Sequence, residues 1–188
     1  MTKIKYYDFD VELRAMEENE ERWIEGYAIK FESISKRRTF LEKISKRALD
    51  NTDMTDVVFL LNHDLNTLMA GTRNLTLSLL VDDIGLKIKA KPIDTITGAD
   101  VYKLVKEGLL NKMSFAFIVD KDSWEQRGDS EIRTIESIKK IFDVSVVTFP
   151  AYEGTSVQAR DRDSVDNLAE EHLKRKEQSK KMEEILNA

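Results

Sequence analysis

Two histidines, His63 and His172, are the imidazole groups through which this chain of 188 residues could do acid–base chemistry. His63 follows the apolar run Val57–Leu61 and lies in the polar triplet Asn62-His63-Asp64. His172 lies in a charged segment near the C-terminus, where we expect an exposed side chain. A histidine within hydrogen-bond reach of a serine hydroxyl can take its proton and make the oxygen a nucleophile. His63 is therefore the candidate base, and the alternative is a structural histidine at the end of a strand.

Ser114 is the candidate nucleophile because of its place at the start of a predicted strand. It follows a turn at Gly108 and opens a segment in which Phe115, Phe117 and Val119 face one way. Alternation of bulky residues with a period of two predicts a β-strand. A hydroxyl at the start of a strand is held rigidly and can still be reached from the end of the sheet. An ordinary half-buried serine is the alternative, and other serines and threonines stay open as nucleophiles.

Two carboxylates could complete a Ser-His-Asp triad, in which the acid fixes the imidazole tautomer and stabilises the imidazolium. Asp64 is adjacent to His63, so we expect its side chain to point away along the strand. Asp143 interrupts the apolar segment 142–149, and burial of a carboxylate is costly unless the carboxylate is paired. Pairing with His63 would offset that cost, whereas an Asp143 that faces solvent would need no partner. From spacing alone we predict a possible serine hydrolase and nothing more specific.

Composition argues against several other chemistries. The chain has no cysteine, which rules out disulfides and thiolate catalysis, and two histidines without cysteine argue against a structural zinc site. The net charge of -5 gives no reason to expect nucleic-acid binding. The N-terminal residues lack the apolar core of a signal peptide, and no apolar run of about 18 residues could span a membrane. A Gly-rich phosphate loop is absent, and we expect neither a cofactor nor a metal.

The elements that must position these residues are mostly strands. Alternation or a short apolar run predicts strands over residues 6–16, 23–31, 57–61, 75–81, 85–91, 114–120, 132–138 and 141–149. The first two should form a hairpin, and so should the pair whose tight turn contains Gly85, placed there for a positive φ. A helix is predicted over 98–110 with Asp94 or Thr97 as its N-cap. Residues 122–129 are predicted to be a turn.

This order of elements predicts an α+β fold that is mainly β. Sheets rich in antiparallel hairpins usually close into a barrel or pack as a sandwich. Residues 1–160 are expected to form one domain. Residues 161–188 are rich in charge and contain no aromatic residue, which predicts a solvated helical or partly disordered tail.

Five segments, in this order, resemble the prohead (capsid maturation) serine proteases of tailed bacteriophages. They are residues 23–31, 60–64, 79–86, 108–117 and 142–151. Each segment is a weak signal alone, but the set includes the histidine and the serine and is fairly specific. The resemblance covers about residues 6 to 160.

The resemblance implies a fold related to the herpesvirus capsid protease, assemblin, which is a closed or nearly closed antiparallel β-barrel with flanking helices. Carried over by motif, His63 is the general base and acid, and Ser114 is the nucleophile. Asp143 fills the third position, where the family often has glutamate. The oxyanion hole is not placed by the sequence, and its candidates are the backbone N–H groups of residues 151–155, Arg73 and Arg160.

The resemblance also implies a serine endopeptidase that cleaves the major capsid protein or scaffold precursor, and itself, inside the assembling prohead in the bacterial cytoplasm. The loop 32–39 and the tail 161–188 are candidates for docking or for control. No nucleic acid and no membrane are expected as partners, and a homo-oligomer is left open. A non-catalytic scaffold or internal core protein of the same fold is the competing interpretation. An α/β-hydrolase is disfavoured because the signature Gly-x-Ser-x-Gly is absent around Ser114.

Overall fold

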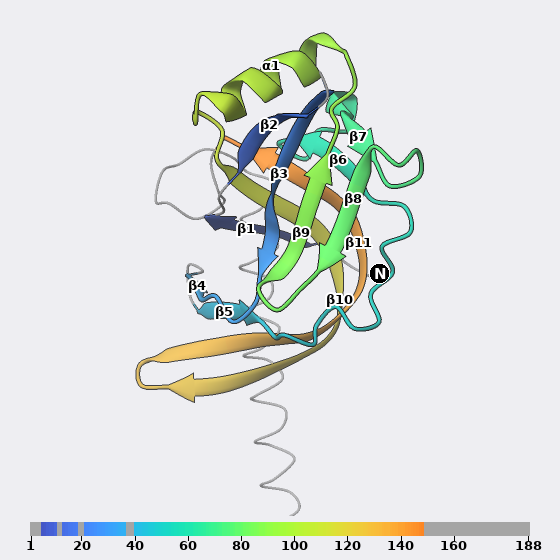
Figure 1. Cartoon of the computed structure of the whole chain (residues 1–188). Coiled ribbons are helices and arrows are strands. Elements are labelled where there is room, and N and C mark those ends of the chain that lie inside the picture. Colours follow the sequence, from blue (N-terminus) through green and yellow to red (C-terminus); the bar gives the residue numbers. More distant parts are fainter. Residues whose placement is uncertain (1–4, 11–12, 19–20, 37–39, 149–188) are drawn as a thin grey trace, which may run out of the picture.

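The computed structural model describes residues 5–10, 13–18, 21–36 and 40–148 (Figure 1). In these ranges the chain forms one α-helix, α1 (Ile96–Lys106), and one short 3₁₀ helix, η1 (Leu65–Thr67). The strands in this part of the chain are β1 (Lys5–Asp10), β2 (Arg14–Glu18), β3 (Glu21–Lys30), β4 (Ser35–Lys36), β5 (Leu41–Ile44), β6 (Val58–Leu61), β7 (Ala70–Gly71), β8 (Leu77–Val81), β9 (Gly85–Ala90), β10 (Lys112–Arg127) and β11 (Ser130–Val147).

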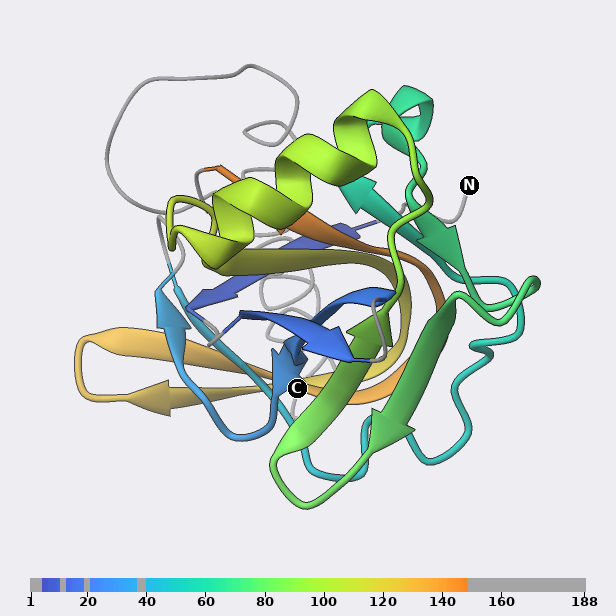
Figure 2. The same ribbon diagram turned by 45° about the horizontal axis from the view of Figure 1, so that its top comes forward.

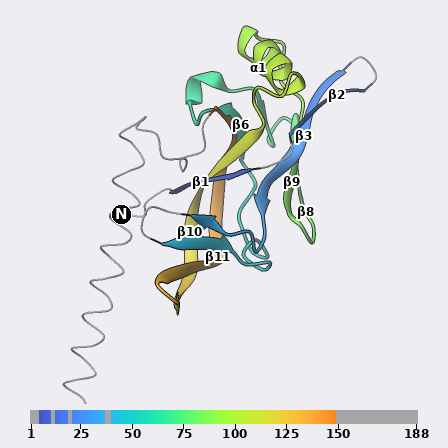
Figure 3. The same cartoon turned by 90° about the vertical axis from the view of Figure 1, so that its left-hand side faces the viewer.

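The strands make two sheets that face each other across the hydrophobic core (Figure 3). The larger sheet has the order β1-β10-β11-β5-β4, and β6 and β7 extend it beside β11. The smaller sheet has the order β2-β3-β9-β8. Ile24 and Ile88 of the smaller sheet share one core with Phe115 and Val144 of the larger sheet. Helix α1 lies across one end of the molecule, against β2 and β3 (Figure 2).

The predicted α+β class with mainly β structure is confirmed, whereas closure into a barrel is not shown. Within the described ranges no strand pairing joins the two sheets. The antiparallel pairing expected of the barrel holds for most strands, but β11 pairs in parallel with both β5 and β6. β11 is long enough to hold β10 along one edge and these two strands along the other. Periodicity identifies a strand but says nothing of the direction of its neighbours.

The first predicted strand, residues 6–16, is in fact two strands in different sheets. β1 pairs with β10, and β2 pairs with β3 in the predicted opening hairpin. Residues 11–12, which connect β1 to the segment before β2, lie outside the described residues. The alternation of apolar and polar residues runs through both strands, so it could not reveal that the chain changes sheet.

β10 and β11 form a long hairpin whose far end projects beyond the two sheets (Figure 1). The turn predicted over residues 122–129 was wrong, because the strands continue until Gly128 turns the chain with a φ of 62°. Within this range the side chain of Asp122 pairs across the ladder. Nε of Arg133 donates to Oδ2 of Asp122 at 2.6 Å. The two strands predicted after this turn are one strand, β11, which continues through several register shifts.

The N-terminus of α1 is capped by Thr95, which lies between the two predicted caps, Asp94 and Thr97. Oγ1 of Thr95 accepts a hydrogen bond from the backbone N–H of Gly98 at 3.0 Å. This bond satisfies one of the backbone donors that every helix leaves open at its N-terminus. The helix therefore begins slightly earlier than predicted, and it ends at Lys106 instead of at residue 110.

Gly85 is required for a close approach of two backbones and not for the positive φ that we predicted. Among the described residues with positive φ, Gly85 is absent. A Cβ atom at this position would lie 1.8 Å from the carbonyl oxygen of Ile29. The backbone of β3 therefore passes so near to the start of β9 that only a hydrogen atom fits.

Candidate active site

Ser114 and Asp143 lie on one face of the larger sheet, opposite to the face that packs in the core. Their neighbours Phe115 and Val144 are core residues, and successive side chains of a strand point to opposite faces. Ser114 on β10 is paired in register with Ser145 on β11, two residues after Asp143. The polar residues that interrupt these apolar strands therefore share a face.

His63 reaches the same site from a tight turn at the end of β6. Asn62 and His63 have φ values of 52° and 58°, and the N–H of Asp64 donates to the carbonyl of Leu61 at 3.0 Å. Two successive positive φ values with this bond are features of a type I′ turn. A left-handed conformation at a residue other than glycine costs about 1–3 kcal/mol and is common at functional sites. Because β6 runs beside β11, the turn brings the imidazole to the strand that carries Asp143.

The imidazole of His63 lies between the other two side chains. Its Nε2 is 2.7 Å from Oγ of Ser114, and its Nδ1 is 2.7 Å from Oδ1 of Asp143. Both distances are those of hydrogen bonds. Ser114 is fully buried, Asp143 is 6% exposed and the His63 side chain is 18% exposed. The structure thus brings together the three residues that the sequence singles out.

The other sequence candidates do not join this group. Oδ1 of Asp64 accepts a hydrogen bond from the N–H of Asn66 at 2.9 Å and caps η1. Arg73, considered for the oxyanion hole, forms an exposed ion pair with Asp56 at 2.5 Å. The remaining candidates, which lie outside the described residues, are His172, Arg160 and residues 151–155.

Two residues that sequence analysis did not single out support this group, one by direct contact and one through the turn that carries His63. Ser145 is fully buried, and its hydroxyl donates to Oδ1 of Asp143 at 2.6 Å while lying 3.2 Å from Nδ1 of His63. The amide of Asn62 accepts from the N–H of Thr148 at 2.9 Å and donates to its Oγ1 at 3.3 Å. Ser145 lies two residues after Asp143 and therefore on the same face of the strand, and this spacing could have revealed Ser145 as a residue of the site. The preference of asparagine for left-handed turns could have revealed Asn62.

The chemistry that this arrangement can do is proton transfer from a hydroxyl. A hydroxyl, an imidazole and a carboxylate in this order can pass a proton from the oxygen to the ring and stabilise the resulting imidazolium. Among the described residues, no group of three or more His, Cys, Asp and Glu side chains could hold a metal ion.

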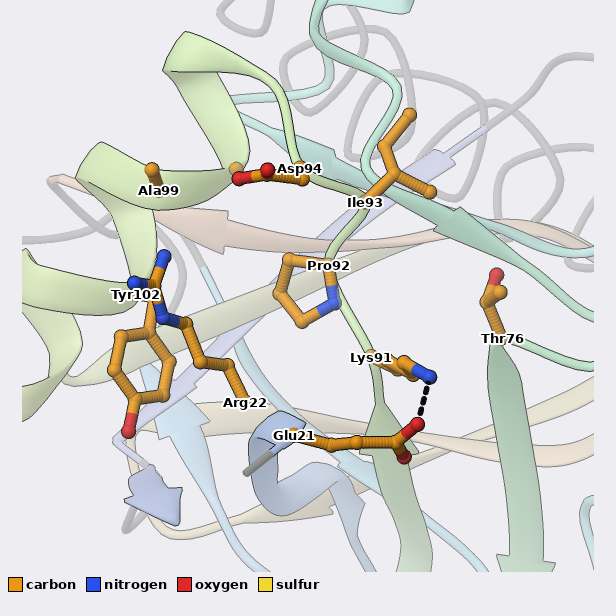
Figure 4. Close-up of a pocket in the computed structure, with 10 residues that line it drawn as sticks. Glu21, Arg22, Thr76, Lys91, Pro92, Ile93, Asp94, Ala99 and Tyr102 are labelled. Carbon is orange, nitrogen blue, oxygen red and sulfur yellow. Dashed lines mark hydrogen bonds and ion pairs between the residues drawn. The ribbon is translucent and has the colours of Figure 1, made fainter. Parts of the chain in front are cut away.

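A cavity of about 350 Å³ lies elsewhere, between α1, the start of β3 and the segment after β9 (Figure 4). Arg22, Pro92 and Tyr102 line it, and Glu21 and Lys91 form an ion pair at its wall. None of the three residues around the His63 imidazole lines this cavity. Its walls carry no base beside a nucleophile, so it is not the candidate active site.

A mainly β protein with a Ser-His-Asp group on one sheet is a candidate hydrolase by its geometry. Residues 9–171 match the family model described as caudovirus prohead serine protease. This match covers most of the chain, and the protein therefore belongs to that family. It is a protease of the phage prohead.

Among solved structures, the chain is similar to the capsid assembly protease gp21 of bacteriophage T4. The two are 12% identical, the TM-score is 0.48, and the similarity covers 76% of this chain and 98% of that chain. No curated protein matches the sequence significantly. In the described part of the chain, no helix has the length and apolar character needed to cross a membrane.

Proposed function

We propose that this protein is a serine endopeptidase with Ser114 as nucleophile, His63 as general base and acid, and Asp143 as the third member. The observation that carries the proposal is the position of the imidazole, at 2.7 Å from both the hydroxyl and the carboxylate. Family membership supports the class of reaction, and the geometry supports the role of each residue.

The first half of the reaction forms an acyl-enzyme. Oγ of Ser114 attacks the carbonyl carbon of the scissile peptide bond while Nε2 of His63 takes the hydroxyl proton. The carboxylate of Asp143 stabilises the imidazolium that results. When the tetrahedral intermediate collapses, the C–N bond breaks and His63 gives its proton to the leaving amine.

The second half returns the enzyme to its starting state. A water molecule attacks the acyl carbon, and His63 now takes a proton from this water. The ester bond to Ser114 breaks, and the serine oxygen regains its proton from the imidazolium. The products are the two halves of the cleaved polypeptide, one with a new carboxyl group and one with a new amino group.

The proposed substrates are the major capsid protein or a scaffold precursor, together with the protease itself, and the proposed place is the assembling prohead in the host cytoplasm. Support comes from the family to which the chain belongs. The loop 32–39 and the tail 161–188 are proposed to serve docking or control, and a tail deletion that leaves packaging unchanged would exclude docking by the tail.

The test compares intact masses of the full chain and its Ser114→Ala variant after expression. We expect the parent to lose a terminal piece that the variant keeps. The matched control is Ser78→Ala, since Ser78 is an exposed serine on β8 and its loss should leave self-cleavage unchanged. Labelling of the parent by a fluorophosphonate probe, followed by mass spectrometry, should place the modification on Ser114.

If the protease becomes active only after assembly, the isolated chain will stay whole, and co-expression with the capsid precursor is then the test. In that case the parent should cut the precursor and Ser114→Ala should leave it whole. Assembled shells that contain the parent protein and uncut precursor, with no labelling of Ser114, would instead favour the non-catalytic scaffold or core protein.

A further inference from the structure

Ser145 contacts both Asp143 and His63, but the proposed mechanism gives it no role. Oδ1 of Asp143 lies 2.7 Å from Nδ1 of His63 and 2.6 Å from Oγ of Ser145, and this Oγ lies 3.2 Å from Nδ1. Ser145 is fully buried and Asp143 almost so. Buried polar groups are nearly always hydrogen-bonded, because a lost partner is not replaced by bulk water. The hydroxyl of Ser145 is therefore part of the site and not a chance contact.

The single hydrogen of the Ser145 hydroxyl has two acceptors within reach, and their distances decide between them. The carboxylate is at 2.6 Å and the ring nitrogen at 3.2 Å. A hydrogen bond to an ionised acceptor is shorter and roughly twice as strong as one between neutral groups. The hydrogen therefore points to Asp143, and the lone pairs of the Ser145 oxygen face Nδ1 of His63.

Two acceptor oxygens, from Asp143 and Ser145, then face Nδ1 of His63. An imidazole nitrogen that faces two acceptors at hydrogen-bond distance is favoured in its protonated form, since a lone pair there would repel both oxygens. In this tautomer the other nitrogen, Nε2, carries the lone pair. Nε2 lies 2.7 Å from Oγ of Ser114, where a lone pair is needed to accept the proton of the nucleophile.

We propose that Ser145 is a positioning residue that holds the carboxylate of Asp143 against Nδ1 and thereby fixes His63 in the tautomer that can accept the proton of Ser114. This inference rests on the proposed function of His63 as the base. Ser145 is suited to the role because it is paired in register with Ser114 across the β10–β11 ladder. A shift of the Ser145 backbone would require the ladder itself to shift.

The decisive experiment is NMR of the full chain labelled with ¹⁵N-histidine. The chain has two histidines, so His172→Gln leaves only the signals of His63. In this background we expect a protonated Nδ1 with a downfield proton resonance and an unprotonated Nε2. In Ser145→Ala, the Nδ1 proton should move upfield or broaden through exchange, because the carboxylate has lost the hydrogen bond from Ser145.

The matched control is Ser137→Ala. Ser137 lies on the same strand, and its hydroxyl also donates to a carboxylate, Oδ2 of Asp120, at 3.2 Å. This pair is exposed and is remote along the strand from the His63 contacts. Its loss should leave the His63 signals unchanged. An unchanged Nδ1 proton in Ser145→Ala would overturn the proposal, whatever the effect of that variant on stability.

The rate of fluorophosphonate labelling supplies an independent readout. Ser145→Ala should slow the labelling of Ser114 about 10–100-fold, the effect of one lost hydrogen bond to a charged group. In an Asp143→Ala background the same change should have almost no further effect, because Ser145 acts through that carboxylate. If Ser145→Ala slows the labelling of Ser114 equally in the parent and in the Asp143→Ala background, Ser145 has only a structural role.

The labelling and NMR results together distinguish failure of the proposed function from failure of the proposed role of Ser145. If the parent is never labelled at Ser114 while its Nδ1 proton still responds to Ser145→Ala, the role of Ser145 stands and the nucleophile must be sought elsewhere. If Ser114 is labelled and the proton does not respond, the function stands and the role of Ser145 falls.

Discussion

The backbone of His63 is in a conformation that most residues avoid, and its neighbour makes that conformation tolerable. Two successive left-handed residues form the turn that aims the imidazole. Asn62 favours this conformation intrinsically, and its side-chain amide binds both the N–H and the hydroxyl of Thr148. Thr148 directly follows β11, the strand that carries Asp143. His63 and Asp143 are therefore linked by Asn62 as well as by their own hydrogen bond.

Substitutions of Asn62 should separate the contribution of its left-handed backbone conformation from that of its side-chain hydrogen bonds to Thr148. Asn62→Gly keeps the left-handed turn but removes the amide, and we expect labelling of Ser114 by a fluorophosphonate to slow about tenfold. Asn62→Ala removes the amide and also disfavours the conformation by about 1–2 kcal/mol, so its labelling should be slower still. Asn66→Ala, on the neighbouring η1, is the control. Labelling of Asn62→Ala at the parental rate would show that the turn needs no such support.

At the scale of single residues, the sequence predicted the three side chains that meet and missed the two that hold them. His63, Ser114 and Asp143 stand out because each is a polar residue beside an apolar run. Ser145 has the same type of neighbours but suggests no chemistry until Asp143 is known to face the ring. Asn62 acts through its backbone conformation and a contact 86 positions away, which no local pattern contains.

At the scale of elements, the contact between β3 and β9 depends on a missing side chain. The carbonyl oxygen of Ile29 would lie 1.8 Å from a Cβ at position 85. Backbone atoms cannot rotate away as a flexible side chain can, so any larger residue must displace one of the two strands.

Gly85→Ala should therefore lower the free energy of unfolding by about 2–3 kcal/mol, the upper part of the range for overpacking. Urea denaturation followed by tryptophan fluorescence would measure this change. Gly128→Ala is a matched control: its φ of 62° disfavours alanine, but no atom lies within 4 Å of a Cβ there. Its cost should be about 1 kcal/mol. A smaller loss for Gly85→Ala than for Gly128→Ala would contradict the role of close approach.

Most strands of the described ranges could be predicted from local alternation, but their partners could not. β5 and β6 pair with β11 in parallel across separations of 91 and 85 residues, and parallel pairs need long connections. The charged hairpin end was mistaken for a turn because polar residues are frequent both in loops and in exposed ladders. In the structure, ion pairs such as that of Arg133 with Asp122 stabilise the strand conformation there.

At the scale of the whole molecule, three carboxylates bind partners in other elements and have pKa values below their ordinary range. A hydrogen bond from Lys140 is the main cause for Asp53, one from Tyr27 for Asp82, and one from Lys121 for Glu136. A carboxyl group whose pKa is lower in the folded state favours folding above the pKa of the unfolded chain. This contribution is lost as the pH falls through the folded-state pKa.

We therefore expect the melting temperature to fall as the pH drops below about 4, the ordinary range of carboxyl groups. Asp82→Asn should lower the melting temperature at neutral pH, and its difference from the parent should shrink as the pH falls below that range. Differential scanning calorimetry between pH 7 and pH 2 would follow both effects. Asp83→Asn, at the neighbouring exposed position, is the control. A difference for Asp82→Asn that stays constant with pH would contradict this assignment.

The place of β11 in the larger sheet also determines when this protein can become active during its own synthesis. β11 is the last strand of the described chain, and it alone joins β1 and β10 to β5 and β6 within that part. Until β11 has been synthesised, His63 and Ser114 lack the carboxylate of Asp143, the proposed third member, and the strand that joins β6 to β10. Pairing between strands far apart in the sequence is intrinsically slow. A nascent or prematurely terminated chain should therefore be inert, and the proposed proteolysis should begin only after β11 has been synthesised.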